Sequence, residues 1–404
     1  MTGAAAGRPQ SLRFLLLYAL AWAGCSIAYV PFLTILLPVR VSHMAGHGPD
    51  VAWLAYIAFF GAIASSIANI VFGALSDRSG QRGGWIWAGL ALSSAALWAV
   101  TQAHGLSSLI AIILVWQVGL NMMLAPLAAW AGDCVPDRQK GLLGGLLAFA
   151  PGLGAVSGAV VTLPGLASAD ARLALVAVLV AACVVPVLVM GAPVAVDCAS
   201  TAIPAPPAAA HGPAQPRLAG RDALRRMWCA RLAVQVAEAA LFSYLYFWFR
   251  SLDPAMGDNP TARVFSVVLI VSVPAALLAG RWADRRDRPI VPLFACALLA
   301  TLGLGAMALA RSLTLAMGAY ALFGFASTIF LSLHSAQTLR VLPRSDRRGR
   351  DLGFFNLTNT VPSLIMPWLT LGIVPSLGFS GLFLLLAGLS LLAAIALAPL
   401  SSRS

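Results

Sequence analysis

The chain reads GALSDRSGQR over residues 73–82 and GRWADRRDR over residues 280–288, and these two stretches decide the fold. In each of them an Asp-Arg step follows a glycine by four residues, and the aspartates Asp77 and Asp284 are 207 residues apart. A second pair of motifs, VPDRQKG at 135–141 and LPRSDRRG at 342–349, repeats with the same separation between its prolines. Two different motifs that share one offset indicate that the chain contains an internal duplication.

Long apolar runs surround these motifs. The 404 residues are 60% hydrophobic and only 10% charged, whereas a soluble domain carries roughly 25% charged residues. A helix needs about 20 apolar residues to cross a membrane. We therefore predict an all-α membrane protein with twelve transmembrane helices, at residues 14–37, 51–76, 84–103, 106–131, 141–163, 171–192, 229–250, 261–282, 289–310, 312–336, 352–375 and 379–399.

The duplication divides these spans into two halves. We predict an N-terminal six-helix bundle over residues 1–192 and a C-terminal six-helix bundle over residues 228–404. The segment between them, 193–227, is rich in proline and alanine and shows no helical period, which is typical of a loosely structured linker. The first apolar run, Phe14 to Pro38, is too long for a cleavable signal peptide and is predicted to be the first span.

The distribution of charge predicts how the chain faces the membrane. With the N-terminus inside, only five of the 26 Lys and Arg residues fall at outer span ends, namely Arg40, Arg172, Arg250, Arg263 and Arg311. Basic residues collect on the cytoplasmic side. Both termini and the linker are therefore predicted to be cytoplasmic, and a nucleic-acid partner is not expected. The use of one lysine among so many arginines points to a GC-rich bacterial genome, and hence to the bacterial inner membrane.

The segment 73–82 resembles the signature loop of the major facilitator superfamily, in which glycine, Asp-Arg and a second glycine and arginine recur at this spacing. The resemblance implies the fold of that superfamily, with two pseudo-symmetric six-helix bundles around a central cavity that opens alternately to either side of the membrane. It also implies a secondary transporter of a small solute and not an enzyme.

This loop is predicted to lock one conformation from the inner surface. An ion-pair cluster of Asp77, Arg78, Arg82 and Asp133 would favour the outward-open state, and a glycine in the loop would allow close helix contact. The alternative is that these charges are solvated and only set the topology. The complete set of predicted lock residues is Gly73, Asp77, Arg78, Arg82, Asp133, Asp284 and Arg285.

Glu238 is the only glutamate of the chain and lies about ten residues into the predicted span 229–250. Polar residues inside a membrane are costly, and they commonly mark functional sites. An apolar environment disfavours the charged form of a carboxyl group, which suits a residue that carries a proton. We predict proton coupling through Glu238. The alternative is a structural carboxyl group that is hydrogen-bonded to a neighbouring helix. Helical spacing places Arg231, Gln235, Phe242 and Tyr246 on the same stripe.

Amide and aromatic side chains inside the spans predict a site for a sugar. Amides offer both donors and acceptors to hydroxyl groups, and an aromatic ring can stack on the apolar face of a sugar. The alternative is that these amides form hydrogen bonds between helices. The predicted substrate-binding residues are Tyr29, Gln117, Asn121, Gln235, Asn356, Asn359 and Thr360.

Two stretches, 121–136 and 351–362, are similar to the glycoside–pentoside–hexuronide cation symporters and the related sucrose-type transporters. This narrower resemblance implies uptake of a sugar or glycoside. The resemblance implies that sodium-coupled members of this group carry acidic residues within the second span. The span 51–76 has none inside it, so coupling to protons, or no coupling at all, is expected in place of sodium coupling. Drug or metabolite efflux is the alternative, because the stretch 150–154 loosely resembles a signature of exporters. The six cysteines form no CxxC motif, and no metal or cofactor is expected. We expect a monomer in the lipid bilayer.

Overall fold

The computed structural model describes residues 9–45, 50–191, 221–286, 288, 290–341 and 348–401, and every regular element in these ranges is a helix. Eleven of the described helical stretches are long and apolar enough to cross a membrane. The last stretch contains two spans, because α13 turns at Gly378, where φ is 65°. Glycine adopts this left-handed conformation without the steric penalty that a Cβ would add. The twelve predicted spans are thus all present, in a multi-pass membrane protein.

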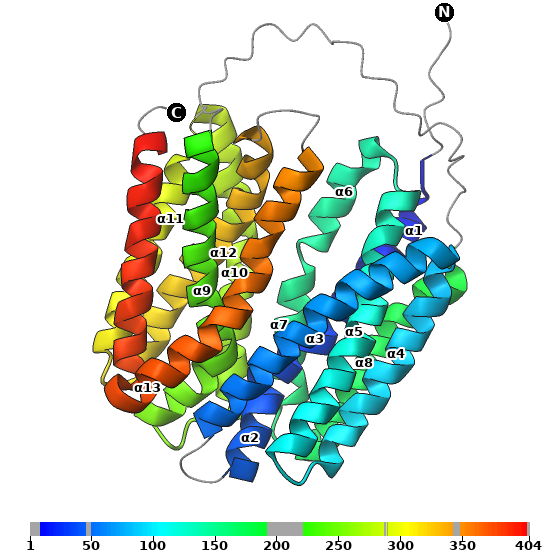
Figure 1. The fold of residues 1–404 in the computed structure, drawn as a ribbon, viewed down its shortest axis with the longest axis horizontal. Coiled ribbons are helices and arrows are strands. Elements are labelled where there is room, and N and C mark those ends of the chain that lie inside the picture. The colour runs from blue at the N-terminus through cyan, green and yellow to red at the C-terminus, as the bar shows by residue number, and fades with distance from the viewer. Residues whose placement is uncertain are drawn as a thin grey trace, which may run out of the picture.

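The first six spans form the N-terminal bundle, on the right in Figure 1. Its helices are α1 (Leu12–Pro31), the π-helix η1 (Phe32–Leu36), α2 (Leu37–Ala45), α3 (Asp50–Ser79), α4 (Arg82–Ala99), the 3-10 turn η2 (Val100–Gln102), α5 (Leu106–Cys134), α6 (Asp137–Leu147), α7 (Ala150–Val161) and α8 (Ala169–Met190). The fifth span combines α6 and α7. Helices α4 and α5 approach closely, because a Cβ at Gly89 would lie only 2.4 Å from the backbone nitrogen of Met123.

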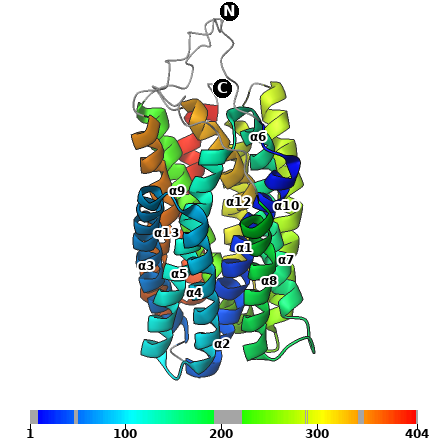
Figure 2. The same cartoon turned by 90° about the vertical axis from the view of Figure 1, so that its right-hand side faces the viewer.

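The last six spans form the C-terminal bundle. Its helices are α9 (Arg221–Leu252), α10 (Asp258–Arg286), α11 (Val291–Leu309), α12 (Leu313–Val341) and α13 (Arg348–Ser401). Helices α9 and α11 pack along α13, and α12 packs against α10 and α11. Figure 2, turned by 90°, shows that the helices of both bundles run roughly parallel to one long direction, as membrane spans must.

Helix α9 begins earlier than the sequence indicated. The predicted linker extended to residue 227, but Arg221–Met227 form the first turns of α9. The apolar residues Ala223, Met227, Ala230 and Val234 are all buried in one cluster with α11 and α12. Their spacing of three and four residues continues the apolar stripe of the span, and this packing extends the helix. The rest of the predicted linker, up to residue 220, lies outside the described residues.

The two bundles meet more closely at one end than at the other. Helix α1 begins, and helix α13 ends, at the upper end of the molecule in Figure 1. We name this end the terminal end and the opposite, lower end the far end. Across the interface, α7 packs against α10, and α3 against α13. One buried apolar cluster contains residues of both bundles. At the terminal end of the C-terminal bundle a separate cluster forms around Met227, Leu293 and Phe330. The bundles are therefore joined mainly toward the far end.

Candidate functional site

Glu238 lies near the middle of α9, as the 18th of its 32 residues. Its side chain is half-buried, and no hydrogen bond or ion pair of its carboxylate is found within the described ranges. It interacts electrostatically with Arg231 on its own helix, with Tyr29 on α1 and with Tyr320 on α12. Since Tyr29 belongs to the other bundle, Glu238 lies on the side of α9 that is turned toward the bundle interface.

An aromatic cluster continues this face of α9 toward the far end. The Phe242 ring lies one turn beyond Glu238, and its centroid is 6.3 Å from that of Tyr29 and 6.2 Å from that of Phe265 on α10. The three rings are tilted or edge-on to one another, which is a favourable arrangement for aromatic pairs. We name Tyr29, Phe242 and Phe265 the ring cluster. It joins three helices of both bundles directly beside Glu238.

Gln235 lies three residues before Glu238, so the two side chains share one face of the helix. Its carbonyl oxygen Oε1 is buried, and no hydrogen-bond partner of this atom occurs in the described part of the chain. Buried polar atoms are nearly always hydrogen-bonded in proteins. Gln235 and Glu238 together form a pair of acceptors for which no described residue supplies a donor.

Arg231, two turns before Glu238, connects α9 to α13. Its Nε donates a hydrogen bond of 3.0 Å to Oγ1 of Thr358, and a terminal nitrogen donates one of 3.2 Å to Oδ1 of Asn359. The sequence placed Arg231 on the stripe of Glu238 but assigned it no role. An arginine inside an otherwise apolar span was the available signal. Of the predicted residues on α13, Asn359 is thus an acceptor for an arginine, and Thr360 is half-buried. The side chain of Asn356 lies outside the described part.

The amides of the N-terminal bundle bond to one another between helices. Asn121 of α5 is buried, with 4% of its surface exposed. Its Nδ2 donates to Oγ of Ser65 and to the carbonyl oxygen of Gln117, both at 2.9 Å. Its Oδ1 accepts from Nδ2 of Asn69 at 3.2 Å. The bonds to Ser65 and Asn69 join α3 and α5, which is the arrangement that the alternative prediction for these amides described.

The loop at the terminal end of the N-terminal bundle contains an ion-pair cluster. Arg82 pairs with Asp77 at 2.5 Å and with Asp133 at 3.0 Å, and it donates to Oγ of Ser76 at 2.6 Å. The cluster connects the ends of α3, α4 and α5, all within one bundle. Arg78, which was predicted to belong to it, is exposed and has no ion pair among the described residues.

The remaining predicted lock residues are Gly73 and, in the repeated motif, Asp284 and Arg285. Gly73 was expected to allow close helix contact, but a Cβ at this position would meet no atom within 4 Å. Helix α3 is not closely packed at this point, and the Gly73 carbonyl accepts a bond of 2.9 Å from Ser76 of the same helix. In the repeated motif, Arg285 is exposed at the end of α10. The side chain of Asp284 lies outside the described part of the chain.

Ser266 of α10, next to the ring cluster, donates to the Ala155 carbonyl of α7 at 2.7 Å, and further polar contacts between the bundles lie toward the far end. Arg172 at the start of α8 forms an ion pair with Asp258 at the start of α10. Nδ2 of Asn259 donates to the Ala159 carbonyl at 2.8 Å, and Arg250 donates to Oγ of Ser42 at 3.0 Å. We name these the far-end contacts. The sequence indicated none of them, because Arg172 and Arg250 appeared only as isolated charges at span ends.

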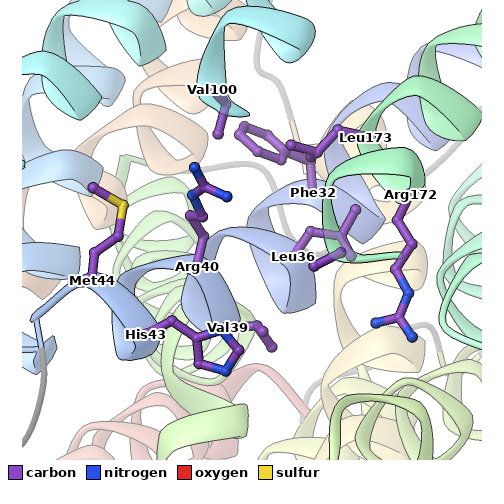
Figure 3. Close-up of a pocket in the computed structure, with 10 residues that line it drawn as sticks. Phe32, Leu36, Val39, Arg40, His43, Met44, Val100, Arg172 and Leu173 are labelled. Carbon is purple, nitrogen blue, oxygen red and sulfur yellow. The ribbon is translucent and has the colours of Figure 1, made fainter. Parts of the chain in front are cut away.

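A pocket of about 170 Å³ lies at the far end of the N-terminal bundle. Figure 3 shows Arg40 in its middle, with Phe32 and Leu173 on one side and Met44 on the other. Arg40 pairs with Asp170 at 2.7 Å and donates to the Thr101 carbonyl at the same distance. None of the predicted site residues lines this pocket. The site around Glu238 and this pocket are therefore separate.

Comparison with known proteins supports the bundle architecture. Residues 255–403 match the Major Facilitator Superfamily. The whole chain is similar to the crystal structure of a bacterial homolog of the human lysosomal transporter Spinster, in an inward-facing and occupied conformation. The TM-score is 0.68 at 14% identity, and the match covers 97% of this chain and 96% of that one. The chain has the major facilitator fold. No curated protein matches it in sequence.

The position of Glu238 can be compared with the general layout of folds built from such repeats. In transporters built from such repeats, substrate and coupling-ion sites lie near the middle of the membrane, at the interface of the repeats. Glu238, Gln235 and the ring cluster occupy that region of the chain. Among the predicted site residues, the structure therefore brings together Tyr29, Gln235 and Glu238. It places the Asn121 side chain in contacts within one bundle, and Gln117 takes part in these contacts through its backbone carbonyl.

Proposed function

We propose that the chain is a secondary transporter that moves a small solute by alternating access, and that Glu238 carries the coupling proton. The observation that supports this most directly is the Glu238 carboxylate, which has no partner in the described part of the chain and lies at mid-depth beside the other bundle. An apolar environment destabilises the charged form of a carboxyl group, and uptake of a proton removes that charge. Its alternate exposure to the two sides would then couple proton flow to transport.

The far-end contacts support the proposal that this conformation is closed on one side. If both termini are cytoplasmic, as the charge distribution predicts, the far end is the outer side of a bacterial inner membrane. The similar solved structure is described as inward-facing, which agrees with this orientation. Transport would then require the Arg172–Asp258 ion pair and its neighbours to separate. We further propose that the Arg82 cluster stabilises the ends of α3, α4 and α5, since its charges belong to one bundle.

Efflux of a metabolite or drug becomes the leading interpretation of substrate and direction. Sugar or glycoside uptake was predicted from amides that would line one cavity. Asn121 and Asn359 instead bond to neighbouring helices, whereas rings and a carboxylate form the interface site. Sugar uptake remains the second candidate, because Asn359, Thr360 and Thr358 form a polar segment of α13 next to Arg231.

Purified protein in lipid vesicles with an imposed pH gradient tests this function. A panel of radiolabelled sugars, glycosides and amines is offered, with protein-free vesicles as the background, because amines follow a pH gradient passively. We expect one class, named the panel substrate below, to be transported against its own gradient by wild type and not by Glu238→Gln. Asp222→Asn is the matched control, because Asp222 is an exposed carboxylate in the first turn of the same helix. Equal gradient-driven transport by Glu238→Gln would refute the coupling role.

A further inference from the structure

The site on α9 presents two acceptors to which no described residue donates a hydrogen bond. Glu238 and the buried Oε1 of Gln235 share one helix face, and neither accepts a hydrogen bond from any residue in the described ranges. A protonated Glu238 carries a single O–H, which can satisfy one acceptor such as the Gln235 oxygen but not several acceptors at once. A ligand with more than one N–H can donate to both side chains while Glu238 stays ionised, and a positive charge on it would also pair with the carboxylate.

The surroundings of this acceptor pair suit a cation that carries an apolar group. The ring cluster lies one turn away, with ring centroids 6.2 and 6.3 Å apart. The faces of aromatic rings attract ammonium groups, and the attraction grows when water is excluded. The same rings offer apolar surface from three helices. A small, strongly hydrated ion would leave this surface unused.

The other charged and titratable groups near Glu238 do not compete for such a cation. These groups are Arg231 on α9, Tyr29 on α1 and Tyr320 on α12. Arg231 lies two turns toward the terminal end, about 10 Å along the helix axis, and its guanidinium is directed to Thr358 and Asn359. The ring cluster lies on the opposite side of Glu238. Glu238 is therefore the only acidic side chain of this site within the described residues.

We propose that this site binds a protonated amine with an aromatic or aliphatic substituent. The ammonium group donates to Glu238 and Gln235, and the substituent packs against the ring cluster. The assignment rests on the proposed function and names its substrate class. Glu238 holds either a proton or the ammonium group, so binding of the amine releases the proton to solvent. Such competition for one carboxylate produces exchange, in which the amine and the proton cross the membrane in opposite directions.

Binding of radiolabelled 2-phenylethylammonium to the purified full-length protein tests the proposal. Equilibrium dialysis in detergent avoids the passive accumulation of amines in vesicles. Two molecules with a similar skeleton serve as controls, namely the neutral 2-phenylethanol and the anionic 3-phenylpropionate. We expect saturable binding of the amine that is at least tenfold tighter than that of either control. Binding weakens as the pH falls in wild type, because protons then compete with the amine for Glu238.

Two variants separate the contribution of the Glu238 carboxylate to amine binding from that of the ring cluster. Glu238→Gln is expected to weaken amine binding at least tenfold and to remove its pH dependence, whereas Asp222→Asn leaves both unchanged. Phe242→Leu keeps the carboxylate and is expected to weaken binding three- to tenfold with the pH dependence intact. If Glu238→Gln fails to fold, the effect of Phe242→Leu on amine binding still tests the proposal. Amine binding to Glu238→Gln at wild-type affinity, or equally tight binding of 3-phenylpropionate, would overturn the proposal.

The vesicle panel distinguishes this failure from failure of the proposed function. If wild type carries out Glu238-dependent, proton-driven transport of a sugar and binds no amine, the amine assignment is wrong and the proton-coupled transporter stands. If Glu238→Gln matches wild type both in amine binding and in every panel transport, both proposals are wrong.

Discussion

The two bundles contain six spans each but use their polar residues differently. In the N-terminal bundle, Asn121 bonds to Ser65 and Asn69, and Arg82 pairs with Asp77 and Asp133, so polar groups mainly join helices of that bundle. In the C-terminal bundle, Glu238 and Gln235 have no described partner and lie toward the other bundle. The two halves therefore share one helical architecture but differ in the role of their polar side chains. We infer that the C-terminal bundle supplies the polar binding groups of the site, whereas the N-terminal bundle contributes the Tyr29 ring.

The largest effect is expected where the two bundles must separate. Ser42→Cys and Arg250→Cys, introduced into a chain without its six native cysteines, place two thiols across the far-end contacts. Joining them with a short bifunctional methanethiosulfonate should stop transport of the panel substrate, and reduction should restore it, because a covalent bridge prevents the far end from opening. Each single cysteine variant treated with the same reagent is the control. Full transport by the bridged protein would show that the far end does not open.

Removal of Arg231 tests whether its hydrogen bonds between α9 and α13 keep the site in position. Arg231→Ala deletes the bonds to Thr358 and Asn359 and leaves Thr358 fully buried. We expect the free energy of unfolding to fall by about 1–3 kcal/mol, the usual cost of a buried group that loses its partner. Transport should fall about tenfold, because α9 and α13 are no longer fixed relative to each other.

Detergent titration and the vesicle assay measure these two quantities. Arg225→Ala is the matched control, since Arg225 is an exposed arginine on the same helix. If Arg231→Ala transports at the wild-type rate, the contact between α9 and α13 does not position the site, and the contrast between the bundles rests on Glu238 alone.

Much of this architecture is readable from the sequence. The apolar runs, their breaks and the 207-residue repeat predict the twelve spans, because membrane crossing requires length and apolarity more than specific partners. The stripe of Glu238, Gln235 and Phe242 follows from helical periodicity. The start of α9 was misplaced, because basic residues in Arg221–Met227 hide an apolar stripe that only packing reveals.

The partners of these polar residues could not be predicted. Arg231 meets residues 127 and 128 positions away, and Asn259 meets a carbonyl group 100 positions away. Such pairings depend on how helices and bundles pack, which no local pattern contains. Amide spacing alone is equally compatible with a substrate site and with helix contacts, and Asn121 turned out to make helix contacts.

A smaller effect is expected from the amides of the N-terminal bundle. Asn121→Leu removes three hydrogen bonds and keeps a side chain that branches at Cγ. Hydrogen bonds between membrane helices contribute about 0.6 kcal/mol each, so the free energy of unfolding should fall by about 2 kcal/mol or less. Transport should stay within about twofold of wild type, with the KM of the panel substrate unchanged. A selective increase in KM would place Asn121 in the binding site and remove the contrast between the bundles.

The smallest effect is expected at the Arg82 cluster, where the acidic partners are about half exposed, at 63% for Asp77 and 51% for Asp133. Exposed ion pairs contribute about 0–1 kcal/mol, so Arg82→Gln should barely change the melting temperature. If the cluster only stabilises three helix ends of one bundle, the transport rate should also change less than twofold. A lock on one conformation predicts the opposite, because removing it would shift the balance between inward- and outward-facing states without loss of stability. Spin labels at the terminal ends of α4 and α11 measure that balance directly: an unchanged distance distribution in Arg82→Gln supports the stabilising role, and a shifted one supports the lock.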